Sequence, residues 1–114
     1  MKLSISNRDQ AGVSVLHLGG RIILGEESNA LRSEIMQLLD ADSKKILLNL
    51  SEVTYVDSSG VGTLVAAHAV AEKHGARIKL TNLSDKFQEA LQITRLVTVL
   101  DTYDNESDAL KSFE

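Results

Sequence analysis

The sequence has no cysteine and no proline among its 114 residues. Without cysteine the chain can form no disulfide bond and no thiolate metal site, which is compatible with a reducing cytoplasm. It also has no repeat and no low-complexity segment that would mark a linker. Because the length is that of one ordinary domain, we expect residues 1–114 to form a single domain.

The chain also lacks a long hydrophobic run and a strong excess of charge. Its most apolar stretch, residues 61–71, contains Gly, Thr and His and is far shorter than the ~20 residues that a membrane span needs. The first residues hold no apolar run of signal-peptide length. A net charge of −4 argues against duplex DNA or an anionic membrane as a partner. The sequence therefore predicts a soluble cytoplasmic domain, and 43% hydrophobic residues suffice for one core.

The spacing of the hydrophobic residues predicts a β-hairpin followed by alternating helices and strands. The hairpin pairs a strand around Leu3 and Ile5 with a strand over 13–18, which Gly19 and Gly20 should end. The elements expected after it are a helix from 26, a strand over 45–50, a helix over 59–74, a strand over 77–83, a short helix from 84 or 85 that carries Phe87, Ala90 and Leu91, a strand over 96–100 and a last helix from 104 or 105.

This order indicates an α/β domain with a mixed sheet, an N-terminal hairpin and about four helices. In such sheets, functional groups tend to lie at the carboxyl ends of parallel strands, where helices begin. That points to the turn after Leu50. The alanines of the following helix are expected to pack closely against the sheet: Ala66, Ala67, Ala69 and Ala71.

The turn ends in the run Asp57-Ser58-Ser59-Gly60-Val61-Gly62. Asp57 and Ser58 are both good N-cap residues, so the plain interpretation is that one of them caps the helix. The two glycines are not explained by a cap, because each costs ~1 kcal/mol relative to alanine in a helix interior and somewhat less near an end. Glycine lets another backbone approach closely. The pattern therefore favours an exposed hydroxyl on a surface that a partner or a kinase approaches.

This run resembles the signature of the STAS domains, and specifically of the bacterial anti-anti-sigma factors. The resemblance covers essentially the whole chain. It includes the hairpin, Gly20 before the first helix, the strand over 46–50, the strand over 77–83 after a glycine stop, and a short C-terminal helix. The motif alone is moderately specific, whereas the motif with this element order and length is strong.

The resemblance implies a binding cycle and no enzymatic activity or cofactor. The unphosphorylated family member binds an anti-sigma factor, which is also a histidine-kinase-like ATPase acting as a serine kinase, and thereby releases a sigma factor. The kinase phosphorylates the serine after the motif aspartate, which is Ser58 here, and a metal-dependent phosphatase resets it. By the same resemblance Asp57 shapes the acceptor site. Ser59, Gly60, Val61 and Gly62 belong to the partner-binding surface.

One segment departs from the family pattern. After Gly20 the family commonly has a polar stretch, whereas this chain has Arg21-Ile22-Ile23-Leu24-Gly25. Ile23 and Leu24 are expected to be partly exposed and to join the partner-binding surface. A second role within the family also fits the sequence, namely an accessory subunit of a transport or stress-signalling complex.

Four other interpretations of the same residues are weaker. A serine hydrolase needs a base and usually G-x-S-x-G, and the upstream glycine is missing here. A nucleotide-binding G-x-G-x-x-G would need its third glycine at Val65, and there is no G-K-[ST]. His68 and Glu72 share a helix face, but such a pair is more often a surface hydrogen bond than a metal site. Ser58 as a simple cap remains the fourth.

Overall fold

The computed structural model describes residues 3–95 and 99–114. Over these residues the elements are β1 (Ser4–Gln10), β2 (Val13–Ile22), α1 (Glu26–Asp40), β3 (Lys45–Val56), α2 (Ser58–Lys73), β4 (Arg77–Thr81), α3 (Asp85–Ile93), β5 (Asp101–Tyr103) and α4 (Glu106–Ser112). The strands form one sheet in the order β1-β2-β3-β4-β5. β1 is antiparallel to β2 and the other pairs are parallel. The predicted α/β class, with its mixed sheet and N-terminal hairpin, is confirmed.

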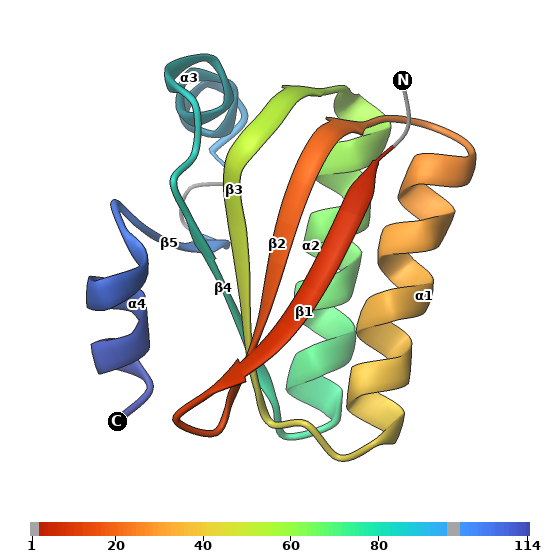
Figure 1. Ribbon diagram of the computed structural model, residues 1–114. Helices are drawn as coiled ribbons and strands as arrows, with labels where there is room; N and C mark the ends of the chain where they lie inside the picture. Colours follow the sequence, from red (N-terminus) through yellow and green to blue (C-terminus); the bar gives the residue numbers. More distant parts are fainter. Residues whose placement is uncertain (1–2, 96–98) are drawn as a thin grey trace.

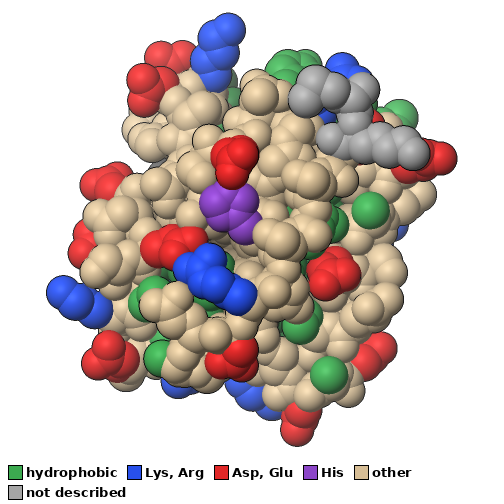
Figure 2. All heavy atoms as spheres, in the orientation of Figure 1, with side chains coloured by type: hydrophobic (Ala, Val, Ile, Leu, Met, Phe, Trp, Pro, Cys, Tyr) green, Lys and Arg blue, Asp and Glu red, His purple; other side chains and the backbone are tan. Residues whose placement is uncertain are grey.

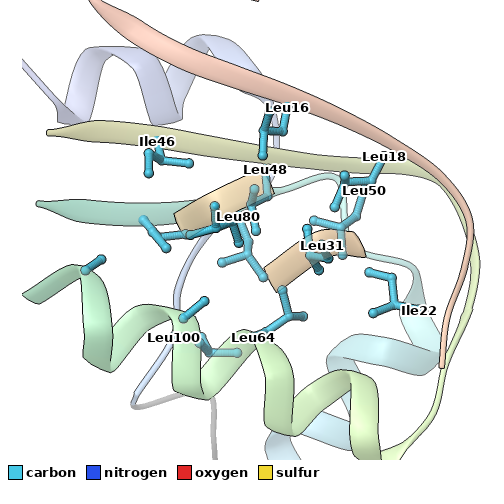
Figure 3. Close-up of a cluster of buried hydrophobic side chains, with 14 of the residues drawn as sticks. Leu16, Leu18, Ile22, Leu31, Ile46, Leu48, Leu50, Leu64, Leu80 and Leu100 are labelled. Atoms are coloured by element: carbon cyan, nitrogen blue, oxygen red, sulfur yellow. The ribbon is translucent and has the colours of Figure 1, made fainter. Parts of the chain in front are cut away.

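The two long helices, α1 and α2, cover one face of the sheet, and α4 packs on the other (Figure 1). α3 lies beyond the end of β4, at the edge where the parallel strands finish. The main core lies between the sheet and the two long helices (Figure 3) and includes Leu16, Leu18, Ile22, Leu31, Ile46, Leu48, Leu50, Leu64, Leu80 and Leu100. No helix of the described residues is long and apolar enough to cross a membrane.

The hairpin turns through Ala11 and Gly12, whose φ angles are 54° and 81°. Left-handed backbone at both positions of a two-residue turn matches the twist of the flanking strands. The predicted end of the second strand at Gly19 and Gly20 was wrong, because β2 continues to Ile22. Its register against β3 shifts at these glycines, so they accommodate an irregular ladder and do not end it.

The central strand is longer than predicted. The expected strand over 45–50 corresponds to its buried half, while β3 continues through largely exposed residues to Val56. β4 is shorter than predicted and ends at Thr81, because Asn82 has a left-handed backbone with φ of 60°. Of the strand predicted over 96–100, residues 96–98 lie outside the described residues and 99–100 are not in a strand. The last strand is β5.

The predicted helix boundaries are largely confirmed. α1 begins at Glu26, and Gly75 follows the C-cap of α2 in a left-handed conformation with φ of 70°. The Ser84 hydroxyl accepts a hydrogen bond from the Phe87 N–H at 3.2 Å, and so caps α3. The Asn105 side chain caps α4 in the same way. Each cap satisfies a backbone donor that the helix itself leaves unpaired.

Candidate functional site

The run at 57–62 begins where β3 ends, and Asp57 is its organising residue. One carboxylate oxygen, Oδ1, accepts a hydrogen bond from the Gly60 N–H at 2.7 Å and so caps α2. The other, Oδ2, accepts from the Leu24 N–H at 3.1 Å. The Asp57 N–H donates to the Ile22 carbonyl at 3.2 Å. A single side chain therefore holds the start of α2 against the loop between β2 and α1.

Because Asp57 is the cap, Ser58 is not, and the simple-cap interpretation of Ser58 was wrong. Ser58 is exposed at the first residue of α2. Among the described residues its hydroxyl makes no hydrogen bond. The Ser58 hydroxyl therefore takes no part in the hydrogen bonding of the described residues, and Ser58 is exposed at the start of α2.

The neighbouring hydroxyls are less accessible. Ser59 is half-buried, and its carbonyl accepts a hydrogen bond from the buried Thr63 hydroxyl at 3.0 Å. Thr63 is only 5% exposed and faces the interior. Of the three hydroxyls in the first turns of α2, the one at Ser58 is the most exposed.

The two glycines of the run have different roles. A Cβ on Gly60 would lie 2.2 Å from the Ile22 carbonyl oxygen and 2.9 Å from Val56 Cγ1, so the helix can only approach β2 this closely with glycine there. Gly60 is thus required by the fold. A Cβ on Gly62 would meet no atom within 4 Å. Packing within the described part of the domain therefore does not require glycine at position 62.

Ser58 and Gly62 line an apolar groove of about 630 Å³ between α2 and α3. Ala66 and Ala69, which were predicted to pack on the sheet, line this groove and are exposed, whereas Ala67 and Ala71 are buried as predicted. The complete lining is Val56, Asp57, Ser58, Val61, Gly62, Val65, Ala66, Ala69, Ala90 and Thr94.

Sequence reasoning missed the α3 side of this groove. Of the three residues predicted on this short helix, Ala90 is exposed and lines the groove together with Thr94. Phe87 and Leu91 are buried. Ala90 and Thr94 are four residues apart and so lie on the same face of the helix. The sequence contains no signal, however, that this face would lie beside α2.

Leu24 extends the apolar surface on the other side of Asp57. Its side chain is 75% exposed, whereas Ile23 is only half-buried. The Ile23 carbonyl accepts hydrogen bonds from both the backbone N–H and the hydroxyl of Ser28, at 3.1 and 2.7 Å. The structure therefore brings together the predicted residues on both sides of Asp57, and it distinguishes the exposed Leu24 from the anchored Ile23.

The histidines do not form a catalytic arrangement with Ser58. His17 Nε2 lies 2.8 Å from Glu52 Oε1 on the sheet, and His68 Nε2 lies 2.7 Å from Glu72 Oε1 on α2. His68 is ten residues beyond Ser58, which is about 15 Å along a helix that rises ~1.5 Å per residue. His74 is farther still. No group of three or more possible metal ligands occurs among residues 3–95 and 99–114.

A model of the STAS domain matches residues 4–109 of this chain. The chain belongs to the STAS domain family. Among curated relatives, the anti-sigma F factor antagonist of Paenibacillus polymyxa is 24% identical over 115 residues, covering 100% of this chain and 97% of the relative. The anti-sigma-B factor antagonist of Bacillus subtilis is 31% identical over 71 residues, covering 62% of this chain and 64% of the relative.

Solved structures share the STAS fold over nearly the whole chain. A Thermotoga maritima protein matches with a TM-score of 0.87 at 22% identity, covering 95% of this chain and 92% of that one. An anti-sigma factor antagonist from Mycobacterium paratuberculosis gives 0.83 at 20% identity, covering 97% and 93%. Unphosphorylated SpoIIAA, an anti-sigma factor antagonist, gives 0.75 at 19% identity, covering 96% and 97%. Its phosphorylated form gives 0.73 at 19% identity, covering 97% and 100%.

Proposed function

We propose that this protein is an anti-sigma factor antagonist controlled by phosphorylation of Ser58. In the unphosphorylated form it binds an anti-sigma factor, which is also a histidine-kinase-like ATPase, and so releases a sigma factor. That kinase phosphorylates Ser58 and a metal-dependent phosphatase reverses the change. The protein acts in the cytoplasm as a binding module with no cofactor and no catalytic activity of its own.

The observation that carries the proposal is the position of the Ser58 hydroxyl. It is exposed at the mouth of an apolar groove and is freed from capping by Asp57. The names of the curated relatives support the same class of partner. SpoIIAA, which shares the fold, has been solved in unphosphorylated and phosphorylated forms.

The proposed partner surface has three parts that meet at Asp57. The start of α2 contributes Ser58, Ser59, Gly60, Val61 and Gly62. The loop after β2 contributes Ile23 and Leu24, with Leu24 as the exposed member. Interface cores favour such apolar groups, and the groove beside Gly62 continues the apolar surface along α2.

In this proposal the charge of the phosphate on Ser58 is what weakens binding of the partner. A phosphoserine carries about −1.5 to −2 charges at pH 7. At the N-terminus of α2 the free N–H groups and the helix dipole favour that anion by roughly 0.3–1 kcal/mol, and repulsion from Asp57 opposes it. The domain itself should tolerate the change. An interface that desolvates the same charge without a matched cation is destabilised much more strongly.

A pull-down with two baits tests the proposal. Ser58→Ala adds no charge to the surface and should retain a histidine-kinase-like ATPase, whereas Ser58→Asp adds a negative charge and should retain it weakly or not at all. Incubating the wild-type protein with the recovered ATPase and ATP should add one phosphate, which peptide mapping places on Ser58. Recovery of a transporter ATPase instead, or a phosphate on Ser59 or Thr63, would contradict the assignment.

A further inference from the structure

One side of α3 is exposed and largely apolar. Ala90, Ile93 and Thr94 are spaced i, i+3 and i+4, so they share a side of the helix. All three are exposed, whereas Phe87 and Leu91 belong to the core. Ile93, at 82%, is the most exposed large hydrophobic residue that the structure describes. The packing of α3 on the core therefore does not account for these three residues.

This side of α3 adjoins the groove that Ser58 lines. Ala90 and Thr94 line the groove from α3. Three of the residues that line it from α2 are small: Gly62, Ala66 and Ala69. From Ser58 to the last of these the groove follows α2 for about 16 Å, at ~1.5 Å per residue. Single exposed apolar side chains are common on proteins, but Ile93 lies beside an apolar groove and next to the proposed acceptor surface.

The acceptor serine indicates which partner covers this groove. In the proposed reaction the Ser58 oxygen bonds to the γ-phosphorus of ATP, ADP leaves, and a base of the kinase takes the hydroxyl proton. Reacting atoms come within about 3–3.5 Å of each other, so the kinase has to lie against the Ser58 end of the groove. Gly62 is one turn further along the same side of α2, ~5–6 Å away between Cβ positions. Because a Cβ there would meet no atom within 4 Å, the groove is open at the point that the kinase reaches.

We propose that α3 is a second docking element for the anti-sigma factor kinase, with Ile93 as an apolar anchor beside the groove. This inference rests on the proposed function and adds contact residues that the motif at 57–62 does not include. An exposed apolar side chain gains free energy when a partner removes it from water. Contacts that are equal before and during phosphoryl transfer lower KM without changing kcat. The α3 contacts should therefore set the affinity for the kinase, while Ser58 accepts the phosphate.

Phosphorylation kinetics with the ATPase that Ser58→Ala retains test this inference. Ile93→Ser removes the anchor, and Ala90→Leu fills the groove from the same side of α3. We expect either change to raise KM for this protein by about tenfold or more. The kcat and the melting temperature should stay nearly unchanged, because both side chains are exposed. Gln92→Ser is the matched control, since Gln92 is exposed on the side of α3 away from Ala90 and Thr94 and its replacement should leave KM as in the wild type.

The outcomes separate this inference from the proposed function. If Ser58 is phosphorylated with the wild-type KM in both variants, the kinase does not dock on α3, and the inference is wrong while the proposed function stands. If sedimentation then shows that Ile93→Ser abolishes self-association of the free protein, a second copy covers α3 instead. An equal rise in KM for Gln92→Ser would also overturn the inference. If the ATPase does not phosphorylate the wild-type protein on Ser58, the proposed function fails and the inference fails with it.

Discussion

At the scale of single residues, some members of the site hold the loop in place and their neighbours are exposed at its surface. Asp57 caps α2 and holds the Leu24 N–H, which leaves the Ser58 hydroxyl unbonded. Gly60 allows α2 to approach the Ile22 carbonyl, whereas Gly62 leaves open space at the groove. Asp57 and Gly60 are therefore needed for the local structure, whereas Ser58 and Gly62 are exposed at the surface. Single substitutions should distinguish the two roles.

The two glycines provide a matched pair of substitutions. Gly60→Ala places a Cβ against backbone that cannot move aside easily, and we expect a loss of ~1–3 kcal/mol in the free energy of unfolding. Gly62→Ala adds the same methyl group to open space and should raise stability by up to ~1 kcal/mol, because alanine favours the helix. Urea denaturation of both variants measures this. Equal destabilisation by both would refute the division of roles.

The exposed Leu24 should matter for binding and not for folding. Leu24→Ser removes a side chain that is mostly in solvent, so we expect the melting temperature to change little and the affinity for the ATPase to fall. Ile23→Ser is the control, since Ile23 is half-buried and its replacement should lower the melting temperature. Calorimetric melting and binding measurements on both variants check this. Unchanged affinity for Leu24→Ser would remove Leu24 from the interface.

At the scale of elements, α4 shows how a short helix is held by charged groups of the sheet. Its seven residues are too few to be stable alone. Ala109 packs on a second apolar cluster with Val13, Val15 and Leu47. Polar contacts from the sheet hold both ends of the helix: Arg8 and Asn49 bind Glu106, and Lys79 binds Ser112. The face that carries α4 has acidic and basic side chains interspersed (Figure 2).

Lys79 holds the C-terminal end of α4 without a carboxylate. Its side chain is buried, and its ammonium group donates to the Ser112 hydroxyl at 2.7 Å and to the Ser112 carbonyl at 3.2 Å. It also lies 4.6 Å from the centre of the Phe113 ring. Lys79→Met keeps most of the volume but loses these contacts, so we expect a loss of ~1.5–3 kcal/mol.

Urea denaturation measures the effect of Lys79→Met on the free energy of unfolding. Amide exchange of α4 is a second, local measurement of the same effect. Lys111→Met, on the exposed side of the same helix, is the control and should have little effect. If Lys79→Met were as stable as the wild type or more so, the cost of burying the ammonium would outweigh its contacts. The account of α4 would then be wrong.

Glu106 makes the attachment of α4 dependent on pH. Burial raises the pKa of Glu106, but hydrogen bonds from Asn49 and Arg8, with the charge of Arg8, outweigh burial and hold the pKa below its usual 4.5. Between the two values the unfolded chain binds more protons than the folded one, so stability falls as pH falls. The contribution is complete above 4.5 and is lost as the pH drops through the folded pKa.

Glu106→Gln should therefore flatten the decline of stability in this acid range. Denaturation curves at a series of pH values below neutrality measure it. Glu89→Gln removes an exposed carboxylate of α3 and should leave the profile as steep as in the wild type. An unchanged profile for Glu106→Gln would show that this carboxylate is not the titrating group.

At the scale of the whole molecule, the order of elements was predictable because the hydrophobic period changes clearly between strands and helices. The motif at 57–62 could be singled out as a candidate site because its glycines depart from helix preferences at the end of a parallel strand. The second half of β3 and the early end of β4 were not predictable, because residues 51–56 are too polar for a buried strand and the turn after Thr81 depends on the left-handed backbone of Asn82. The α3 side of the groove depends on tertiary placement, which local spacing does not encode.

The central claim is that a phosphate on Ser58 controls the complex and leaves the fold intact. The most direct measurement is calorimetric titration of the ATPase into unphosphorylated and Ser58-phosphorylated protein, with amide spectra of both free forms. We predict that affinity falls by about 100-fold or more, which corresponds to about 2.7 kcal/mol or more and is in the range expected for an unmatched charge at a desolvated interface. Spectral changes should be confined to the start of α2 and the Leu24 loop. Equal affinity of the two forms, or shifts throughout the sheet, would contradict the account.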